Sequence, residues 1–237
     1  MLISVHLPKT AGSSFRKSLA EHFGERLFED YGDRPINTPP FRRNLQALCR
    51  AMLYGAKSFR GIECIHGHFL PLKYAALRFR QQTRWVTWLR DPADRLVSHY
   101  HYFQRTYTPA APSRLQRRMV EEQWSLERFC LCRELRNFYS QFLWGLPRGW
   151  FDFIGLVEHY AEDMRDFARA LLGVALPMYE ENVNADKQSR GYTVDPELRK
   201  QIEAWHARDV ALYRQALARR QARLQAGTTS PDISSRL

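Results

Sequence analysis

Apolar residues follow two alternating patterns along the chain: short continuous runs, and longer stretches in which they recur with a helical period. The short runs are typical of strands buried on both faces, and the helical period is typical of helices that cover them. Strands are predicted at 2–7, 61–68, 84–89 and 151–157. Helices are predicted through Phe15, Leu19 and Phe23, and at 44–54, 92–104, 125–144, 159–172 and 196–226. The alternation predicts an α/β fold with a central, mostly parallel sheet flanked by helices.

The chain is long and apolar enough for one substantial core. It has 237 residues, 44% of them hydrophobic, and no internal repeat or linker divides it. We therefore expect a single domain over residues 1–226, followed by a disordered tail over 227–237. Proline-rich or polar surface loops are expected at 30–42, 105–114 and 182–196.

A formal charge of +11 and a pI near 9.8 indicate anionic partners, such as nucleotides, nucleic acid, acidic polysaccharide or a membrane surface. No zinc finger or RNP motif accompanies the charge. No apolar run approaches the roughly 20 residues of a membrane span, so stable membrane insertion is not expected.

If Met1 is the natural start, there is no room for a signal peptide and a cytoplasmic location is expected. If an N-terminal anchor has been removed, the chain is expected to be the luminal domain of a Golgi enzyme.

Residues 5–16, VHLPKTAGSSFR, have the parts of a phosphate-binding turn. A strand runs into a helix whose first N–H groups, with the positive end of the helix dipole, point at one spot. Lys9 adds a full charge there, although it precedes Gly12, so the order is not that of a Walker A loop. Hydroxyl donors follow at Thr10, Ser13 and Ser14. The stretch predicts an anion site; the alternative is an ordinary strand-to-helix turn with a surface lysine.

Polar residues also follow two other predicted strands. Arg90 stands directly after strand 84–89, and Ser98 lies about two turns into the next helix. An arginine fork and a serine hydroxyl can hold a phosphate, although Arg90 could instead pair with Asp91 or Asp94.

The third cluster is His66-Gly67-His68, at the end of strand 61–68. Parallel sheets bind ligands beyond the carboxyl ends of their strands. We therefore expect the phosphate turn, Arg90 and these histidines to share one rim of the sheet.

Taken together, PKTAGSSF, HGH and RDPxxRLVSxYxYF resemble the sulfotransferases that use 3′-phosphoadenosine-5′-phosphosulfate (PAPS), particularly those related to heparan and uronyl 2-O-sulfotransferases. Weaker matches follow in the family's order at 137–145, 155–160, 182–184 and 209–216, so the resemblance covers about residues 4–217. It implies a P-loop-like sulfotransferase fold. It also implies transfer of a sulfuryl group from PAPS to a hydroxyl of a carbohydrate acceptor, with no metal required.

The resemblance implies a role for each part of the site. Lys9 would contact the 5′-phosphosulfate and stabilise charge on the departing phosphate. Arg90 and Ser98 would bind the 3′-phosphate, and Lys187 would lie at the adenine or 3′-phosphate end. The phosphate oxygens would be held by Thr10, Gly12, Ser13 and Ser14. Gly12 stands where many relatives carry a serine, so one hydroxyl contact would be lost there while the backbone contact remains.

His66 and His68 match the family's candidate base positions. An alcohol is a poor nucleophile until its proton is removed, and an imidazole with a pKa near 6.5 suits that task. Residues i and i+2 of a strand share a face, so both histidines are expected to point into the cleft. We expect His68 to be the base and His66 to position or assist it. Without the resemblance, each is more often a core or surface histidine.

Other readings stay open. Four arginines after the Ser98 helix could hold a uronic acid or a sulfated saccharide, or form a solvated basic helix: Arg105, Arg114, Arg117 and Arg118. A P-loop-type nucleotide kinase is the enzyme alternative, disfavoured by the missing Walker A glycine. A non-catalytic basic nucleic-acid-binding protein would account for the charge, and a donor-binding but inactive homologue is also possible. Cys130 and Cys132 lie close in the chain, but no second cysteine pair or suitably spaced histidine completes a zinc site.

Overall fold

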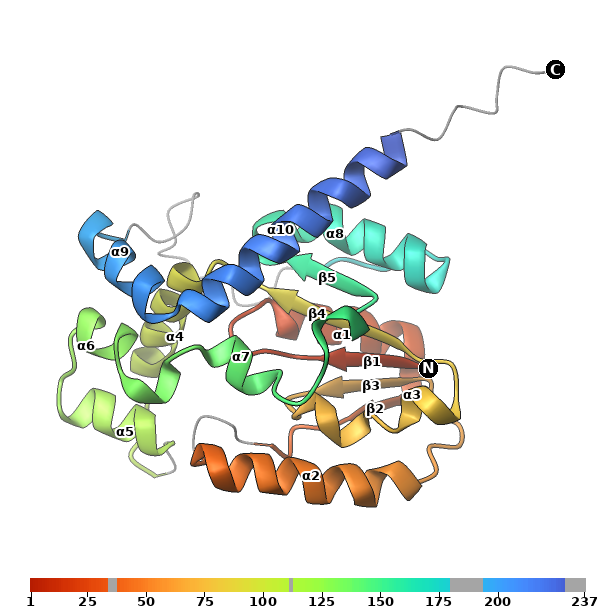
Figure 1. Ribbon diagram of the computed structural model, residues 1–237, viewed down its shortest axis with the longest axis horizontal. Helices are drawn as coiled ribbons and strands as arrows, with labels where there is room; N and C mark the ends of the chain where they lie inside the picture. The colour runs from red at the N-terminus through yellow and green to blue at the C-terminus, as the bar shows by residue number, and fades with distance from the viewer. Residues whose placement is uncertain (34–37, 111–112, 180–193, 229–237) are drawn as a thin grey trace.

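In the computed structural model, which describes residues 1–33, 38–110, 113–179 and 194–228, five parallel strands form one sheet (Figure 1). Their spatial order is β2 (Leu27–Glu29), β3 (Cys64–Gly67), β1 (Leu2–Val5), β4 (Arg84–Leu89) and β5 (Phe153–Leu156). All four neighbouring pairs are parallel. The predicted α/β class, with a parallel sheet flanked by helices, is confirmed. β2 was not predicted, because three residues are too few to establish a strand pattern.

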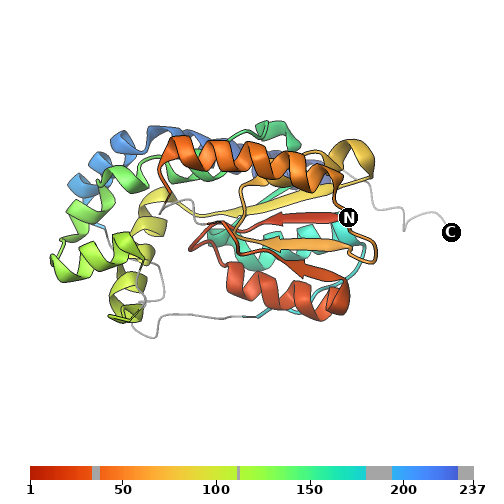
Figure 2. The same cartoon turned by 90° about the horizontal axis from the view of Figure 1, so that it is seen from below.

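Helices cover both faces of the sheet (Figure 2). One face packs against α1 (Gly12–Phe23) and α8 (Tyr160–Phe167). The other lies under α2 (Pro40–Ala56), α3 (Leu77–Arg80), α7 (Phe138–Phe142) and α10 (Ala207–Thr228). Successive strand residues face opposite sides, so Leu2 packs in the core under α1 and Ile3 in the core under α7.

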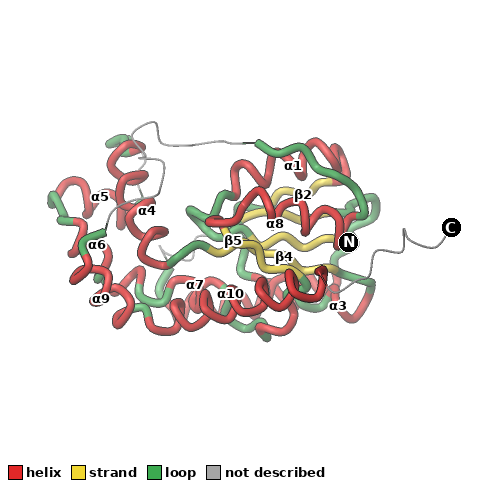
Figure 3. The backbone as a smooth tube through the Cα atoms, turned by 90° about the horizontal axis from the view of Figure 1, so that it is seen from above, coloured by secondary structure: helices red, strands yellow, loops and turns green. Residues whose placement is uncertain are grey.

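A third group of helices lies beyond the carboxyl ends of the strands (Figure 3). It consists of α4 (Pro92–Thr106), α5 (Arg114–Glu121), α6 (Leu126–Cys130) and α9 (Pro196–Trp205). Leu96, Phe103, Phe129 and Ile202 form its own apolar cluster. The rim on which the predicted site residues converge therefore faces this group, not open solvent on all sides.

Short helical turns complete the described chain. Single 3₁₀ turns lie at Gly24–Arg26, Pro71–Tyr74, Arg133–Leu135, Arg148–Trp150 and Val157–His159, and α8 continues as a π-helical turn over Ala168–Leu172. The helix predicted over 44–54 starts earlier, at Pro40, so the end of the predicted loop 30–42 is helical. No helix within the described ranges is both long and apolar enough to cross a membrane.

The single helix predicted over 125–144 is wrong. The segment forms α6 and α7, with a left-handed residue, Asn137 (φ 51°), directly before α7. The N–H groups of Tyr139 and Ser140 donate to the carboxylate of Asp209 at 2.9 and 3.0 Å. A side chain from α10 thus caps α7, and no local pattern reveals such a cap.

The predicted final helix, 196–226, is also interrupted. His206 separates α9 from α10 and uses both ring nitrogens: Nδ1 accepts from the N–H of Asn137 at 3.1 Å, and Nε2 lies 2.8 Å from the carbonyl of Cys130. The helix then continues to Thr228, so the predicted tail 227–237 begins inside it. Residues 229–237 lie outside the described residues, as does Lys187 in the predicted loop 182–196.

Candidate active site

Three neighbouring strands bring the predicted site residues to one edge of the sheet. β1 lies between β3 and β4, and Val5 pairs with Gly67 on one side and Thr87 on the other. Adjacent strands are about 4.8 Å apart, so the segments that follow them leave the sheet side by side. The expectation that the turn after β1, the histidines of β3 and Arg90 share one rim is confirmed.

The turn between β1 and α1 has a strained backbone. Lys9 and Ala11 both adopt left-handed conformations, with φ of 69° and 59°. Such conformations are uncommon for residues other than glycine, and they concentrate at binding sites. Thr10 is fully buried, and its hydroxyl donates to the carbonyl of Leu7 at 2.8 Å, so it holds the turn itself. Ala11, at the N-cap of α1, has no capping side chain, which suits the first turn of the helix to an anion.

Lys9 lies in a concentration of positive charge. Its Nζ is 4.1 Å from the ring centroid of Tyr102 on α4. Burial, followed by the charges of Arg105 and Arg90, lowers the pKa of Lys9 to about 8. Three cations with overlapping fields repel one another, and a negatively charged ligand relieves that repulsion. This corner of the molecule therefore favours an anion.

One face of α4 is turned toward Lys9. Tyr102 and Arg105 lie on this face, and Ser98, one turn before Tyr102, shares it at a spacing of four residues. Ser98 is buried, with 8% of its surface exposed. Ser13 of the phosphate turn is exposed and Ser14 is buried.

The backbone of Arg90 is held by one side chain. The hydroxyl of Tyr139 accepts from the N–H of Arg90 at 3.2 Å and donates to its carbonyl at 2.7 Å. The carboxylates considered above as partners of Arg90 are bound by Arg199, at 3.0 Å from Asp91 and 2.7 Å from Asp94. Asp91 also caps α4. These two acids thus have structural roles of their own.

The two histidines of β3 have different surroundings. His66 is fully buried; its Nδ1 lies 2.8 Å from Oγ of Ser4, and its ring packs against Phe15 of α1. Burial, followed by the nearby His68, lowers the pKa of His66 to about 3, so its ring is neutral at physiological pH. The expectation that both histidines face an open cleft is wrong for His66, because the core under α1 covers it.

His68 is half-buried and has a defined tautomer. Its Nδ1 lies 2.7 Å from the carbonyl oxygen of His6. A carbonyl can only accept, so Nδ1 carries the proton and Nε2 keeps a lone pair. The pKa of His68 is lowered, because burial lowers it more than the hydrogen bond to the carbonyl of His6 raises it. At neutral pH, His68 therefore presents an unprotonated Nε2.

His6, which the sequence pattern did not single out, lies between these two rings. Its ring centroid is 4.1 Å from that of His68 and 5.3 Å from that of His66, and both contacts are stacked. A Cβ on Gly12 would fall inside the imidazole of His6, so the absence of a side chain at residue 12 makes room for this ring. The available signal was its position two residues after Ser4, on the same face of the strand.

A groove of about 780 Å³ opens between α2, α5, α7 and the start of α10. Six arginines line it: Arg43, Arg114, Arg118, Arg133, Arg136 and Arg208. Glu134 is the one acid among the described residues that line it. Of the four arginines named from the sequence, Arg114 and Arg118 line this groove, whereas Arg105 lies beside Lys9 and Arg117 pairs with Glu121 on the surface of α5.

The groove borders the residues around His68. Gln141 lines the groove, and the ring centroid of its neighbour Phe142 is 6.3 Å from that of His68. Arg43 lines both the groove and a smaller hollow of about 190 Å³ that includes Asp33. The N–H of Asp33 donates to the carbonyl of His68 at 3.2 Å. A ligand in the groove would thus lie next to the histidine end of the rim.

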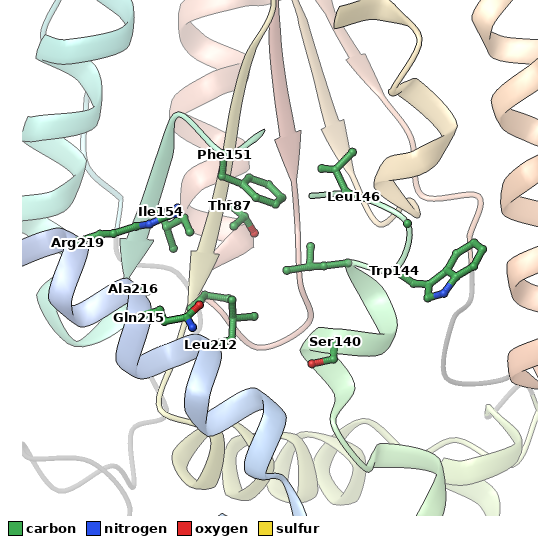
Figure 4. Close-up of a pocket in the computed structure, with 13 residues that line it drawn as sticks. Thr87, Ser140, Trp144, Leu146, Phe151, Ile154, Leu212, Gln215, Ala216 and Arg219 are labelled. Carbon is green, nitrogen blue, oxygen red and sulfur yellow. The ribbon is translucent and has the colours of Figure 1, made fainter. Parts of the chain in front are cut away.

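A second cavity, of about 240 Å³, lies between β4, β5, α7 and α10 and shares Ser140 and Trp144 with the arginine-lined groove (Figure 4). Leu212 and Ala216 of α10 line it together with Ile154 and Thr87 of the sheet. Among the described residues that line it, Arg219 alone is ionisable. The described lining of the cavity holds no acid–base pair. Within the described ranges, no three His, Cys, Asp or Glu side chains are grouped to hold a metal ion.

No family model matches the chain, and no curated protein matches it. Among solved structures, the chain is similar to a sulfotransferase from Alicyclobacillus acidocaldarius, with 18% sequence identity over 89% of this chain and 92% of that chain. The TM-score of 0.45 marks a distant likeness, so the residues at the rim must carry any assignment of function.

Proposed function

We propose that this chain is a sulfotransferase that moves a sulfuryl group from PAPS to a hydroxyl of a carbohydrate acceptor by in-line transfer. One observation carries the proposal: a turn at the start of α1, with left-handed residues and overlapping positive charges, lies on the same rim as a histidine whose Nε2 can accept a proton. The sequence resemblance points to the same donor and the same residues.

The proposed donor carries phosphate at two positions, and each would have its own set of contacts. At the 5′ end, Lys9 would supply a charge, and the phosphate oxygens would be bound by the N–H groups of Thr10 and Gly12 and by Ser13 and Ser14. At the 3′ end, the proposed contacts are Arg90, Ser98 and Lys187. The hydroxyl of Thr10 is left out because it bonds Leu7.

Lys9 is the residue proposed to stabilise the leaving group. Transfer breaks the bond between sulfur and the 5′-phosphate oxygen, and a fixed cation beside that oxygen stabilises the charge that develops on it. With a pKa of about 8, Lys9 is mainly protonated at pH 7 and can act in this way.

His68 is proposed as the general base. Its Nε2 would take the proton of the acceptor hydroxyl as the oxygen bonds to sulfur, while Nδ1–H stays bonded to the carbonyl of His6. The carbonyl then faces a positive ring and stabilises it. His6 stacks on this ring and His66 stacks on His6, so both would act as positioning residues. His66 is also fully buried and cannot meet an acceptor directly.

The arginine-lined groove is the proposed acceptor site. Guanidinium groups bind carboxylates and sulfates through paired hydrogen bonds. An acceptor saccharide with acidic groups would therefore fit a groove in which six arginines face one acid.

Transfer from radiolabelled PAPS to a panel of neutral and acidic saccharides tests the proposal. We expect the label to appear in an acidic saccharide. His68→Ala should still bind the donor product 3′-phosphoadenosine-5′-phosphate (PAP), but its transfer rate should fall by about 10²–10⁴-fold. His22→Ala, near the far end of α1, is the matched control and should leave transfer unchanged. Absence of transfer to any saccharide, or full turnover in His68→Ala, would overturn the assignment. Transfer of phosphate from ATP would favour the kinase alternative, and nucleic-acid binding without transfer the non-catalytic one.

A further inference from the structure

Helix α2 carries an apolar stripe on the outside of the molecule. Phe41, Leu45, Leu48 and Met52 recur on one face at i, i+4, i+7 and i+11, and each is between 49% and 79% exposed. A surface helix normally turns such a stripe toward the core. A row of exposed large apolar side chains marks a surface that contacts another apolar phase.

The opposite face of α2 is turned inward, with Ala47 buried and Tyr54 packed on the core, and two arginines on this face make polar contacts. Arg43 is 4% exposed and donates to Oε1 of Gln141 at 2.6 Å. Arg50, two helical turns after Arg43, pairs with the buried carboxylate of Asp33. Rotation of the helix to bury its stripe would break both contacts, so the outward orientation belongs to the fold.

The sequence around this helix holds nearly all the net charge of the protein. Residues 34–90 contain eleven lysines and arginines and a single acid, Glu63, so they account for +10 of the formal +11. Glu63 is itself paired with Arg26 at 2.5 Å. The remaining residues are almost neutral in sum. Not all of these cations lie at the stripe, since Lys73 pairs with Asp30, Arg84 pairs with Asp152 and Arg90 is buried at the rim of the sheet. The segment that carries the stripe, residues 38–61, has five lysines and arginines and no acid, so it is positively charged in its own right.

Exposed cations lie near the stripe in the chain. Arg42 is on α2 and exposed. Lys57 directly follows α2 and is also exposed, with its Nζ 5.2–5.4 Å from the ring centroids of Phe28, Tyr54 and Phe59. At the end of α3, the guanidinium of Arg80 bonds to the carbonyl of Gly55, which brings α3 against the end of α2. Phe79, beside Arg80, is 79% exposed, and its ring meets that of Trp150 edge-on at 5.8 Å.

We propose that the outer face of α2 docks on an anionic lipid bilayer and lies in its interface. The apolar side chains would enter the boundary between headgroups and acyl chains, and the nearby cations would meet the anionic headgroups. A second copy of the chain fits this face less well. Two such faces packed together would set cations against cations, because residues 38–61 contain no acid.

This docking has a consequence for the groove described above. Pro40 and Arg43, at the start of α2, also line the arginine groove. Docking on α2 therefore places one wall of the groove next to the membrane surface.

Co-sedimentation of the full chain with vesicles tests the inference. Binding is expected to phosphatidylcholine vesicles that contain phosphatidylglycerol, and to be much weaker to phosphatidylcholine alone. Phe41→Gln with Met52→Gln should lower the partition coefficient about tenfold or more. Arg42→Gln with Lys57→Gln should lower it about 25-fold on the anionic vesicles, since each cation near such a surface contributes about fivefold.

Matched controls remove side chains of the same kinds elsewhere. Val174→Gln with Leu224→Gln replaces two exposed apolar residues, and Arg165→Gln with Lys200→Gln replaces two exposed cations; both pairs should bind like the wild type. Failure of the wild type to bind anionic vesicles, or equal losses in the controls, would overturn the proposal. A lipid-free dimer that Phe41→Gln with Met52→Gln dissociates would also overturn it, because a second copy would then cover this face. None of these measurements depends on sulfuryl transfer.

Discussion

Gly12→Ala is expected to destabilise the protein, although the same change in a helix usually does the opposite. Gly12 is the first residue of α1 and does not have a positive φ, so its backbone accepts alanine. Replacing a helical glycine by alanine normally stabilises by about 0.5–1 kcal/mol. Here the new Cβ would fall inside the imidazole of His6, which must then leave its place between His66 and His68.

The size of the effect follows from two opposing contributions. Forcing an extra carbon into a packed site costs about 1–3 kcal/mol, which exceeds the helical gain, so Gly12→Ala should destabilise by about 1–2 kcal/mol. In a His6→Ala background the ring is gone, and Gly12→Ala should stabilise by about 0.5–1 kcal/mol. The coupling between the two changes is then about 2 kcal/mol, well beyond the ~0.5 kcal/mol within which independent sites add.

Urea unfolding of the wild type, the two single variants and the double variant measures this coupling. Gly149→Ala is the matched control, because a Cβ at Gly149 meets nothing within 4 Å and its φ is not positive. Stabilisation by Gly12→Ala in the wild-type background, or additive single effects, would refute the packing of His6 over Gly12.

Three further outcomes follow from the site. The transfer rate should rise as pH increases through the lowered pKa of His68, below 6.5, and should fall above about pH 8 as Lys9 loses its proton. If the fall in rate stays near pH 8 in Lys9→Arg, the alkaline limb does not belong to Lys9. The pKa of His66 is about 3 in the folded state and about 6.5 in the unfolded state, so on acidification the unfolded state binds a proton first and the free energy of unfolding falls, by about 2 kcal/mol at pH 5 relative to its value above pH 6.5. Urea midpoints for His66→Asn should show a correspondingly smaller loss on acidification, and a loss equal to that of the wild type would contradict the lowered pKa of His66. Arg114→Gln should raise the KM for an acidic saccharide about tenfold and leave PAP affinity unchanged, whereas Arg117→Gln on the same helix should change neither; equal KM effects would remove Arg114 from the acceptor site.

The elements predicted best from the sequence are those whose boundaries are set by residues close to them in the chain. β4 spans the predicted residues 84–89, and α4 starts at the predicted Pro92, because Asp91 supplies a cap next to it in the chain. The elements that differ depend on distant partners. α7 is capped by Asp209, and the break before α10 places His206 between Asn137 and Cys130. No local pattern contains these contacts.

The candidate site divides in the same way. Strand ends and motifs located the rim, since their position follows from the alternation of strands and helices. They did not reveal that His66 is sealed under α1, or that His6 stacks between the two histidines of β3. Those facts depend on the side chain missing at Gly12 and on how β1 and β3 pair, which only the folded chain displays.

Calorimetry with PAP and with ATP, both without magnesium, tests the donor site most directly. PAP is expected to bind at least about tenfold more tightly than ATP, because only PAP carries a phosphate for Arg90 at its 3′ position. Arg90→Ala should weaken PAP by about 10–100-fold, the contribution of hydrogen bonds to a charged group, and leave ATP unaffected. Equal affinities for the two nucleotides, or binding of PAP that requires magnesium, would contradict the proposed donor site.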